Sequence, residues 1–176
     1  MRCWHKDLIP VLPRQQLLGQ WRECCLIAKS IAEKGTPNHL LVNKIMEYSR
    51  EEFYNYGWLV HEAMFRRGYK NDFYLFTKHF ADSQICSFNI LDVSDIFKTW
   101  HNDRYLAQCY YNLQEKYDCG GISEDEWQKI EDFYRERSAL VECNVFDKET
   151  TYTDCTVQIL ENSVTGETSV GWWRNE

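Results

Sequence analysis

The chain has 176 residues, of which 44% are hydrophobic and 15% aromatic, so a folded domain with a real core is expected and a disordered chain is excluded. The net charge is −7, but it is uneven: residues 1–80 carry 12 Lys and Arg against 8 Asp and Glu, whereas residues 81–176 carry 8 against 19. The N-terminal half can therefore face DNA phosphates, and the acidity of the C-terminal half is best explained as an aid to solubility.

The cysteine pattern and the first residues bear on metal binding and on the compartment. The eight cysteines include no Cys-x-x-Cys pair, so no metal site is expected. The first residues lack the apolar run of a signal peptide, and no apolar stretch is long enough to cross a membrane. We therefore predict a cytoplasmic protein with mostly buried, reduced thiols, no cofactor and no membrane partner.

The first predicted helix begins at Pro13 and ends before Gly35. At about 100° per residue, one side of this helix is apolar. Its members are Leu17, Trp21, Cys24, Cys25, Ala28, Ile31 and Ala32. The opposite side carries a polar stripe, interrupted by Leu26, which consists of Gln15, Gly19, Arg22 and Glu23. This stripe is either an ordinary solvated face or a surface that binds a partner.

A second helix is predicted from Ser49, which forms a capping box with Glu52, to a C′ glycine at Gly68. Its apolar side consists of Phe53, Gly57, Leu59, Val60, Ala63 and Met64. Arg66 and Arg67 in the last turn fit the helix dipole as well as they fit DNA. Residues 69–100 are rich in aromatic side chains, and a short helical piece is expected near 95–100.

A third helix is predicted over 103–117 and a fourth from Ser123 to about Leu140. The third has an apolar side of Leu106, Cys109, Tyr110 and Leu113, and the fourth begins with a second capping box, Ser123 with Glu126. Residues 155–160 and 169–173, separated by turn residues, predict a β-hairpin. The predicted fold is mainly α, with a helical domain over 1–140 and a hairpin appendage over 141–176.

Three segments in chain order resemble the pyrimidine-dimer DNA glycosylases of phages and bacteria, the endonuclease V family with AP lyase activity. The segments are QQLLGQWREC (15–24), EEFYNYGWLVHEAMFRRGY (51–69) and NDRYLAQCYYNLQEK (102–116). The resemblance covers about residues 1–118. It implies a compact helical domain of the endonuclease V type that acts as a monomer, without a metal, on damaged or abasic double-stranded DNA in a bacterial or phage-infected cell.

The resemblance also implies a mechanism in which the N-terminal amine attacks the sugar and forms a Schiff base. Members of the family expose a small residue by removing Met1, but the bulk of Arg2 normally prevents that removal, so the amine is assigned to Met1. Glu23 matches the carboxylate beside the amine. The predicted catalytic residues are therefore Met1, Arg2 and Glu23, and the predicted DNA-binding residues are Arg14, Gln15, Gln16 and Arg22.

The chain also departs from the family pattern. Leu26 stands where the family has an arginine, and Gln16 where it has a histidine, so fewer phosphate contacts are expected. The segment ISEDEWQKIEDFY (122–134) is acidic where the family is aromatic and basic. An alternative is therefore a non-catalytic binding module, which binds DNA, a nucleotide or a host protein and uses the hairpin as a contact surface. On either hypothesis Trp4 and His5 are expected to be packed residues.

Overall fold

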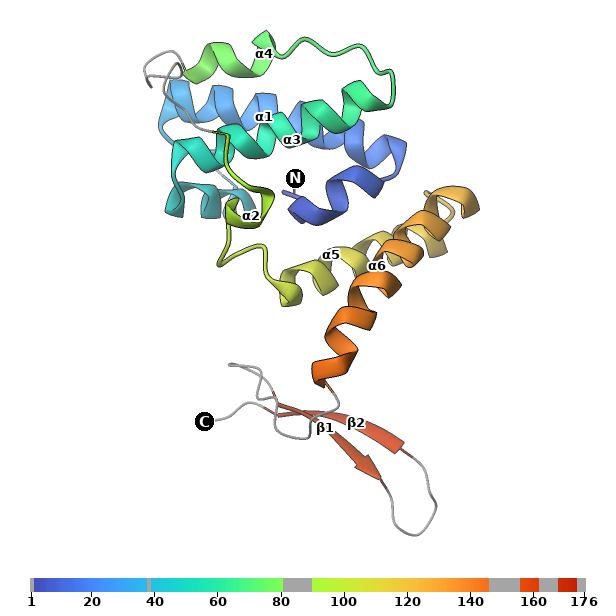
Figure 1. Cartoon of the computed structure of the whole chain (residues 1–176). Coiled ribbons are helices and arrows are strands. Elements are labelled where there is room, and N and C mark those ends of the chain that lie inside the picture. Colours follow the sequence, from blue (N-terminus) through green and yellow to red (C-terminus); the bar gives the residue numbers. More distant parts are fainter. Residues whose placement is uncertain (1, 38, 81–89, 146–155, 162–167, 174–176) are drawn as a thin grey trace. The chain divides into compact units, whose positions relative to one another are not determined.

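The computed structural model describes residues 2–37, 39–80, 90–145, 156–161 and 168–173 (Figure 1). The chain divides into two compact units, Met1–Tyr134 and Arg135–Glu176, and each is described by itself. The predicted division at residue 140 stays a prediction. The described part is mainly α, as the sequence predicts.

The first unit begins with a short 3-10 helix, η1 (Lys6–Val11), followed by the long helix α1 (Arg14–Lys34). Pro13 is the N-cap of α1 rather than its first residue. Gly35 ends the helix as predicted: it has a φ of 75°, and its N–H donates to the Ile31 carbonyl at 2.9 Å. Only glycine adopts this left-handed conformation without strain.

The buried side of α1 differs from the predicted one. It consists of Leu17, Gln20, Trp21, Cys24, Ile27 and Ala28. Cys25 and Ile31 are only half-buried and Ala32 is exposed, so the assignment of these three to the core side was wrong or only partly right. At about 100° per residue the buried stripe is centred about 40° from the predicted one. The rotation arises because the start of the chain packs along one edge of α1 and covers Gln20, which hydropathy alone assigns to solvent.

After α2 (Leu40–Asn43) and η2 (Lys44–Glu47), helix α3 runs over Arg50–Arg66. Both bonds of the predicted capping box between Ser49 and Glu52 are present, and Gly68 follows with a φ of 74°. The buried side of α3 includes the predicted residues except Leu59, which is half-buried, and adds Asn55 and Tyr56.

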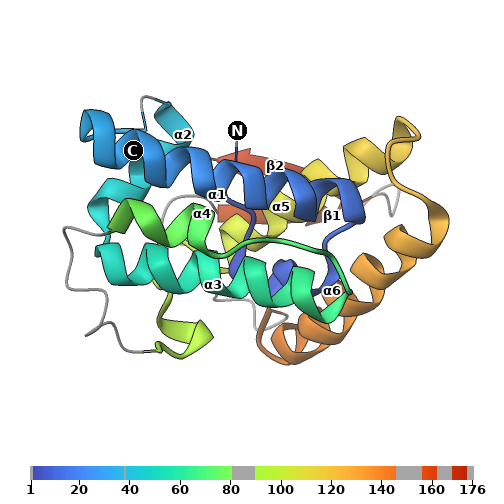
Figure 2. The same cartoon turned by 90° about the horizontal axis from the view of Figure 1, so that it is seen from above.

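Helix α4 (Tyr74–Thr77) lies against both α1 and α3, which run side by side (Figures 1 and 2). The fully buried ring of Phe76 packs on Gly57 of α3 so closely that a Cβ at Gly57 would lie 2.3 Å from the ring atom Cζ. A glycine is therefore required at this position for α4 to sit where it does. The 3-10 helix η3 (Lys78–Phe80) follows α4.

The helical piece predicted near 95–100 was wrong. A 3-10 helix, η5, spans Val93–Asp95, and residues 96–100 form turns. The Lys6 ammonium group takes the carbonyl oxygens of Ser94 and Ile96, each at 2.7 Å, and Phe97 has a φ of 49°. Both features are incompatible with a continuous helix, since a helix needs those carbonyls for its own hydrogen bonds.

Helix α5 (Asp103–Asp118) is capped by Asn102, whose side chain accepts from the Tyr105 N–H, and its buried residues are Leu106, Cys109 and Leu113. Helix α6 (Glu124–Val145) starts where Ser123 predicts and continues past Leu140.

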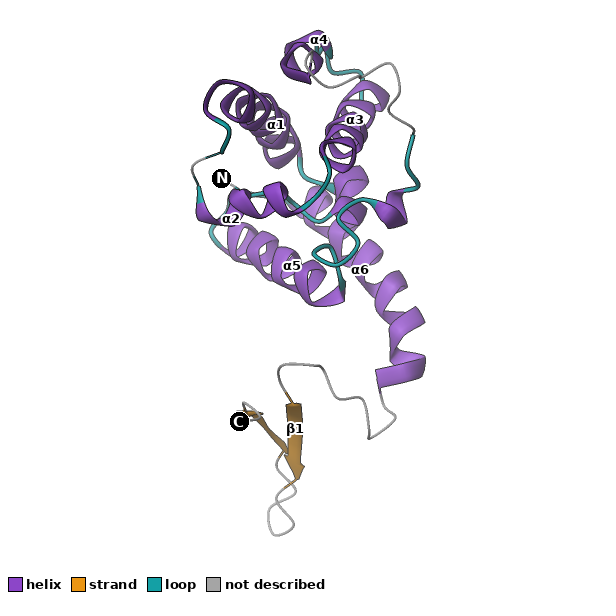
Figure 3. Ribbon diagram, turned by 90° about the vertical axis from the view of Figure 1, so that its left-hand side faces the viewer, coloured by secondary structure: helices purple, strands orange, loops and turns teal. Residues whose placement is uncertain are grey.

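In the second unit, β1 (Thr156–Glu161) and β2 (Thr168–Trp173) pair antiparallel, with Thr156 opposite Trp173 (Figure 3). The predicted turn between the strands lies outside the described residues. Among the described helices, none is long and apolar enough to span a membrane.

Candidate functional site

The feature that brings predicted site residues together is a hydrogen bond between the start of the chain and α1. The backbone nitrogen of Arg2 donates to the Glu23 carboxylate, with 2.9 Å between N and Oε2. Arg2 and Glu23 are both half-buried, so the carboxylate is fixed by the protein and remains reachable from solvent. Met1, the third predicted catalytic residue, lies outside the described residues.

The segment that carries Arg2 is held by side chains from three helices. Gln20 of α1 accepts from the Trp4 N–H at 3.0 Å, and Tyr56 of α3 donates to the Trp4 carbonyl at 2.7 Å. Tyr105 of α5 donates to the Cys3 carbonyl at 2.5 Å. These bonds replace the backbone partners that a strand would find in a sheet, and they fix the course of the chain that leads to Glu23.

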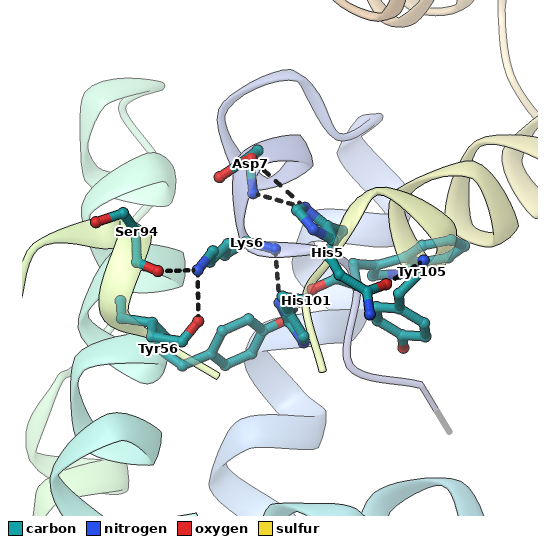
Figure 4. Close-up of polar contacts among 10 residues, drawn as sticks. His5, Lys6, Asp7, Tyr56, Ser94, His101 and Tyr105 are labelled. Carbon is teal, nitrogen blue, oxygen red and sulfur yellow. Dashed lines mark hydrogen bonds and ion pairs between the residues drawn. The ribbon is translucent and has the colours of Figure 1, made fainter. Parts of the chain in front are cut away.

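Two buried histidines and a buried lysine extend this anchorage (Figure 4). His101 Nδ1 accepts from the Lys6 N–H at 2.9 Å, while the Lys6 side chain points toward Ser94. The His5 ring stacks on His101, with 5.1 Å between the ring centroids. Trp4 and His5 are thus packed residues, as expected from the sequence. Because the Lys6 ammonium group donates to two carbonyls, Lys6 is structural and is not a free amine nucleophile.

Burial keeps His101, Cys3 and Tyr105 uncharged near neutral pH because it shifts the pKa of each group. It lowers the pKa of His101 from 6.5 to about 2, with smaller contributions from His5 and Lys6. Burial likewise raises the pKa of the Cys3 thiol and of the Tyr105 hydroxyl well above their ordinary values. Neither group ionises near neutral pH, so both remain packing and hydrogen-bonding groups rather than nucleophiles or bases.

The polar stripe of α1, of which Glu23 forms one edge, faces solvent. Gln15 and Arg22 are exposed, Gly19 is half-buried, and the apolar interruption Leu26 has 56% of its surface exposed. The Arg22 Nε donates to the Leu18 carbonyl of its own helix at 3.3 Å, which leaves the rest of the guanidinium at the surface. The stripe is therefore a surface feature, as its helical spacing predicts.

The other two predicted DNA-binding residues lie at the first turn of α1, roughly 10–14 Å along the helix axis from Glu23. The Arg14 guanidinium lies over the Tyr69 ring, 5.9 Å from its centroid, and the Arg14 N–H donates to Glu126 at 2.7 Å. Gln16 is half-buried, and its Oε1 has no hydrogen-bond partner among the described residues. Arg14 is exposed, whereas Gln16 points partly into the protein.

A comparison with known protein families assigns the part of the chain that contains this site. Residues 1–76 match the family model of pyrimidine dimer DNA glycosylases. This part of the chain belongs to that family. The glycosylase match is shorter than the resemblance expected over 1–118, so the likeness of the 102–116 segment stays a prediction. Neither a curated protein nor a solved structure matches the chain.

The matched region contains the predicted site residues that the structure describes: Arg2, Arg14, Gln15, Gln16, Arg22 and Glu23. Helical spacing and motifs did not predict the residues that hold the N-terminal segment, above all Gln20, Tyr56 and Tyr105. The part of the chain that the structure describes contains no cluster of His, Cys, Asp or Glu that could hold a metal, and Cys3, Cys24, Cys25, Cys109 and Cys119 are free thiols.

Proposed function

We propose that this protein is a DNA glycosylase with AP lyase activity, which removes damaged or modified pyrimidines from duplex DNA through its N-terminal amine. Membership of residues 1–76 in the family supports a damaged-DNA substrate. The observation that carries the proposal is the 2.9 Å contact between the Arg2 nitrogen and the Glu23 carboxylate, at the start of the chain and beside a solvent-facing polar stripe.

In the proposed reaction, an α-amine with a pKa of about 7.7–8.0 is unprotonated in roughly a tenth or more of the molecules at pH 7, far more than a lysine would be, and this form attacks the sugar C1′. The new C–N bond forms as the bond to the damaged base breaks, and the base leaves with a proton. The sugar ring opens to an imine on the N-terminal nitrogen. Loss of a C2′ proton then expels the 3′ phosphate, and water later hydrolyses the imine. Glu23 stabilises the cationic sugar and carries protons.

The nitrogen that reacts depends on Met1. With Met1 present, the Arg2 nitrogen is an amide, which is not nucleophilic, and the reactive amine belongs to Met1. If Met1 is removed, the Arg2 nitrogen becomes the amine, at the position from which it now donates to Glu23. Mass spectrometry of the N-terminal peptide, after it has been trapped on DNA, distinguishes these two cases because the adduct lies either on Met1 or on Arg2.

We propose that Arg14, Gln15, Gln16 and Arg22 contact the DNA around the reactive sugar, with Arg22 on a phosphate and Gln15 on a base edge or the backbone. The protein is proposed to act as a monomer. Its helical part is proposed to have the endonuclease V type of fold, with the antiparallel strand pair as a small appendage.

The test is borohydride trapping on oligonucleotides that are ultraviolet-damaged, abasic or undamaged, compared side by side. We expect a covalent adduct with the abasic duplex and a cleaved strand with the ultraviolet-damaged duplex. A chain with an intact N-terminus that forms no adduct with any of the three would refute the proposal.

The second candidate is a binding module without chemistry, and one observation favours it. The exposed Leu26 places an apolar side chain on the stripe where a further phosphate contact would be expected. Such a module would bind DNA, a nucleotide or a protein without forming the adduct, so the same trapping experiment separates the two candidates.

A further inference from the structure

A cleft of about 490 Å³ opens beside Arg2, which among the described residues is the one predicted site residue that lines it. Arg2 lines it together with residues from η2 and from the region 99–112 that leads into and includes most of α5. Figure 3 shows α2 and its continuation beside α5, on the side of the unit where the chain begins. All of these elements belong to the first unit.

The lining of this cleft is positively charged. Three cationic side chains, Arg2, Lys44 and Arg104, contribute to it, and no Asp or Glu does. Lys44 and Arg104 are both exposed residues of this lining. In a chain with a net charge of −7, a cleft lined by three cations and no carboxylate selects an anionic ligand.

The polar groups on α5 follow one line along the helix. Arg104, Gln108 and Asn112 are spaced four residues apart, so they share one face of α5 over about 12 Å. This length corresponds to about three base-pair steps of 3.4 Å along the axis of duplex DNA. A row of hydrogen-bonding side chains beside cations suits the backbone of a DNA strand rather than a compact metabolite.

The cleft is also connected to the reactive end of the chain. Tyr105 forms part of its wall, and the Tyr105 hydroxyl donates to the Cys3 carbonyl, one residue after the nitrogen that contacts Glu23. A strand held in the cleft is therefore placed next to the proposed nucleophile by the same element that anchors the N-terminal segment.

We infer that this cleft binds the sugar–phosphate backbone of the DNA strand that flanks the reactive sugar, with Lys44 and Arg104 as phosphate contacts. This inference rests on the proposed function. It assigns DNA binding to residues of α5, which lie beyond the 1–76 family match and in the half of the chain that is acidic overall. It thus extends the interface past the polar stripe of α1.

The experiment compares two double variants of the full chain, Lys44→Gln with Arg104→Gln, and Lys34→Gln with Lys116→Gln. The second pair is the matched control, since it removes the same charge from exposed lysines that do not line the cleft. The dissociation constant for an abasic duplex is measured over a range of salt concentrations. We then plot the logarithm of the binding constant against the logarithm of the salt concentration. The slope is expected to become shallower by about 1.8 in the cleft variant. In the control variant it is expected to equal that of the wild type.

A cleft variant whose slope and affinity equal those of the control would overturn the inference. Thymidine monophosphate, added at matched ionic strength, is expected to leave the duplex bound, and specific displacement would assign the cleft to a free nucleotide instead. Trapping by the wild-type chain is measured in parallel. If trapping occurs but the slopes agree, only this inference fails; if the slopes differ without trapping, only the proposed chemistry fails.

Discussion

Replacing Glu23 with glutamine is the most informative single change, because it removes a charge and almost nothing else. Glutamine has nearly the same size and keeps a carbonyl oxygen that can accept from the Arg2 N–H, now 2.9 Å from the carboxylate. The loss in folding stability is limited to the difference between a charge-assisted and a neutral hydrogen bond, which is about 1 kcal/mol. Glu23 is half-buried, so no unpaired polar group is left in the core.

The expected effect on the reaction is much larger than the effect on stability. In the proposed reaction the carboxylate faces the position where positive charge develops on the sugar and the imine, and it also carries protons. Loss of one such group costs about 10²–10³ in rate, equivalent to about 3–4 kcal/mol. The assay is single-turnover borohydride trapping at saturating abasic duplex, with the dissociation constant measured separately by gel shift.

Glu33→Gln is the control, because it makes the same charge change on the same helix at an exposed residue, which pairs with Lys29 at 3.8 Å. Its trapping rate is expected to stay within about twofold of the wild type, since a surface ion pair contributes little. If Glu23→Gln traps at the wild-type rate, Glu23 is not the catalytic carboxylate. If affinity falls as far as the rate, Glu23 acts in binding rather than in the chemical step.

Three further changes test the packing around the site. Tyr105→Phe should destabilise the fold by about 1–3 kcal/mol and lower the trapping rate more than the DNA affinity, whereas the exposed Tyr111→Phe should change neither. The neutral His101 ring should contribute fully to the free energy of unfolding above pH 6.5. This contribution should be lost as the pH falls toward 2, by up to about 1.4 kcal/mol per pH unit. Urea titrations should therefore give a lower free energy of unfolding at pH 5 than at pH 7, and His101→Asn should reduce this difference. In thermal unfolding, Gly57→Ala should cost about 1–3 kcal/mol and Gly19→Ala, where a Cβ meets nothing within 4 Å, should stabilise by about 0.5–1 kcal/mol.

The helix boundaries could be predicted because their signals are local. The Ser49 capping box, the left-handed Gly35 and the Asn102 cap each act within four residues of the helix end that they define. The prediction failed at 95–100, where the determining partner is Lys6, some 90 residues earlier in the chain. A periodic pattern carries no information about a lysine that reaches in from elsewhere in the fold.

The same limit applies to the site. Helical spacing placed Gln15, Arg22 and Glu23 on one surface stripe, and their exposure agrees with this. It gave no sign that Gln20, Tyr56 and Tyr105 would hold the backbone of residues 3–4, because those bonds join residues that are 16, 52 and 102 positions apart. The catalytic role of Glu23 and the DNA-binding roles of Gln15 and Arg22 stay predictions.

The 40° rotation of the buried stripe on α1 explains how one carboxylate can be both fixed and accessible. At about 100° per residue, Gln20 lies inside the buried stripe and Glu23 lies about 60° away, at its edge. The N-terminal segment follows this edge, so the Trp4 N–H meets Gln20 in the interior while the Arg2 N–H meets Glu23 at the surface. A carboxylate at the centre of the buried side would be unreachable for DNA, and one at the centre of the exposed stripe would have no backbone partner to fix it. The proposed catalysis by the chain terminus requires a carboxylate at this boundary, because there the rest of the segment is anchored in the core while its end stays exposed.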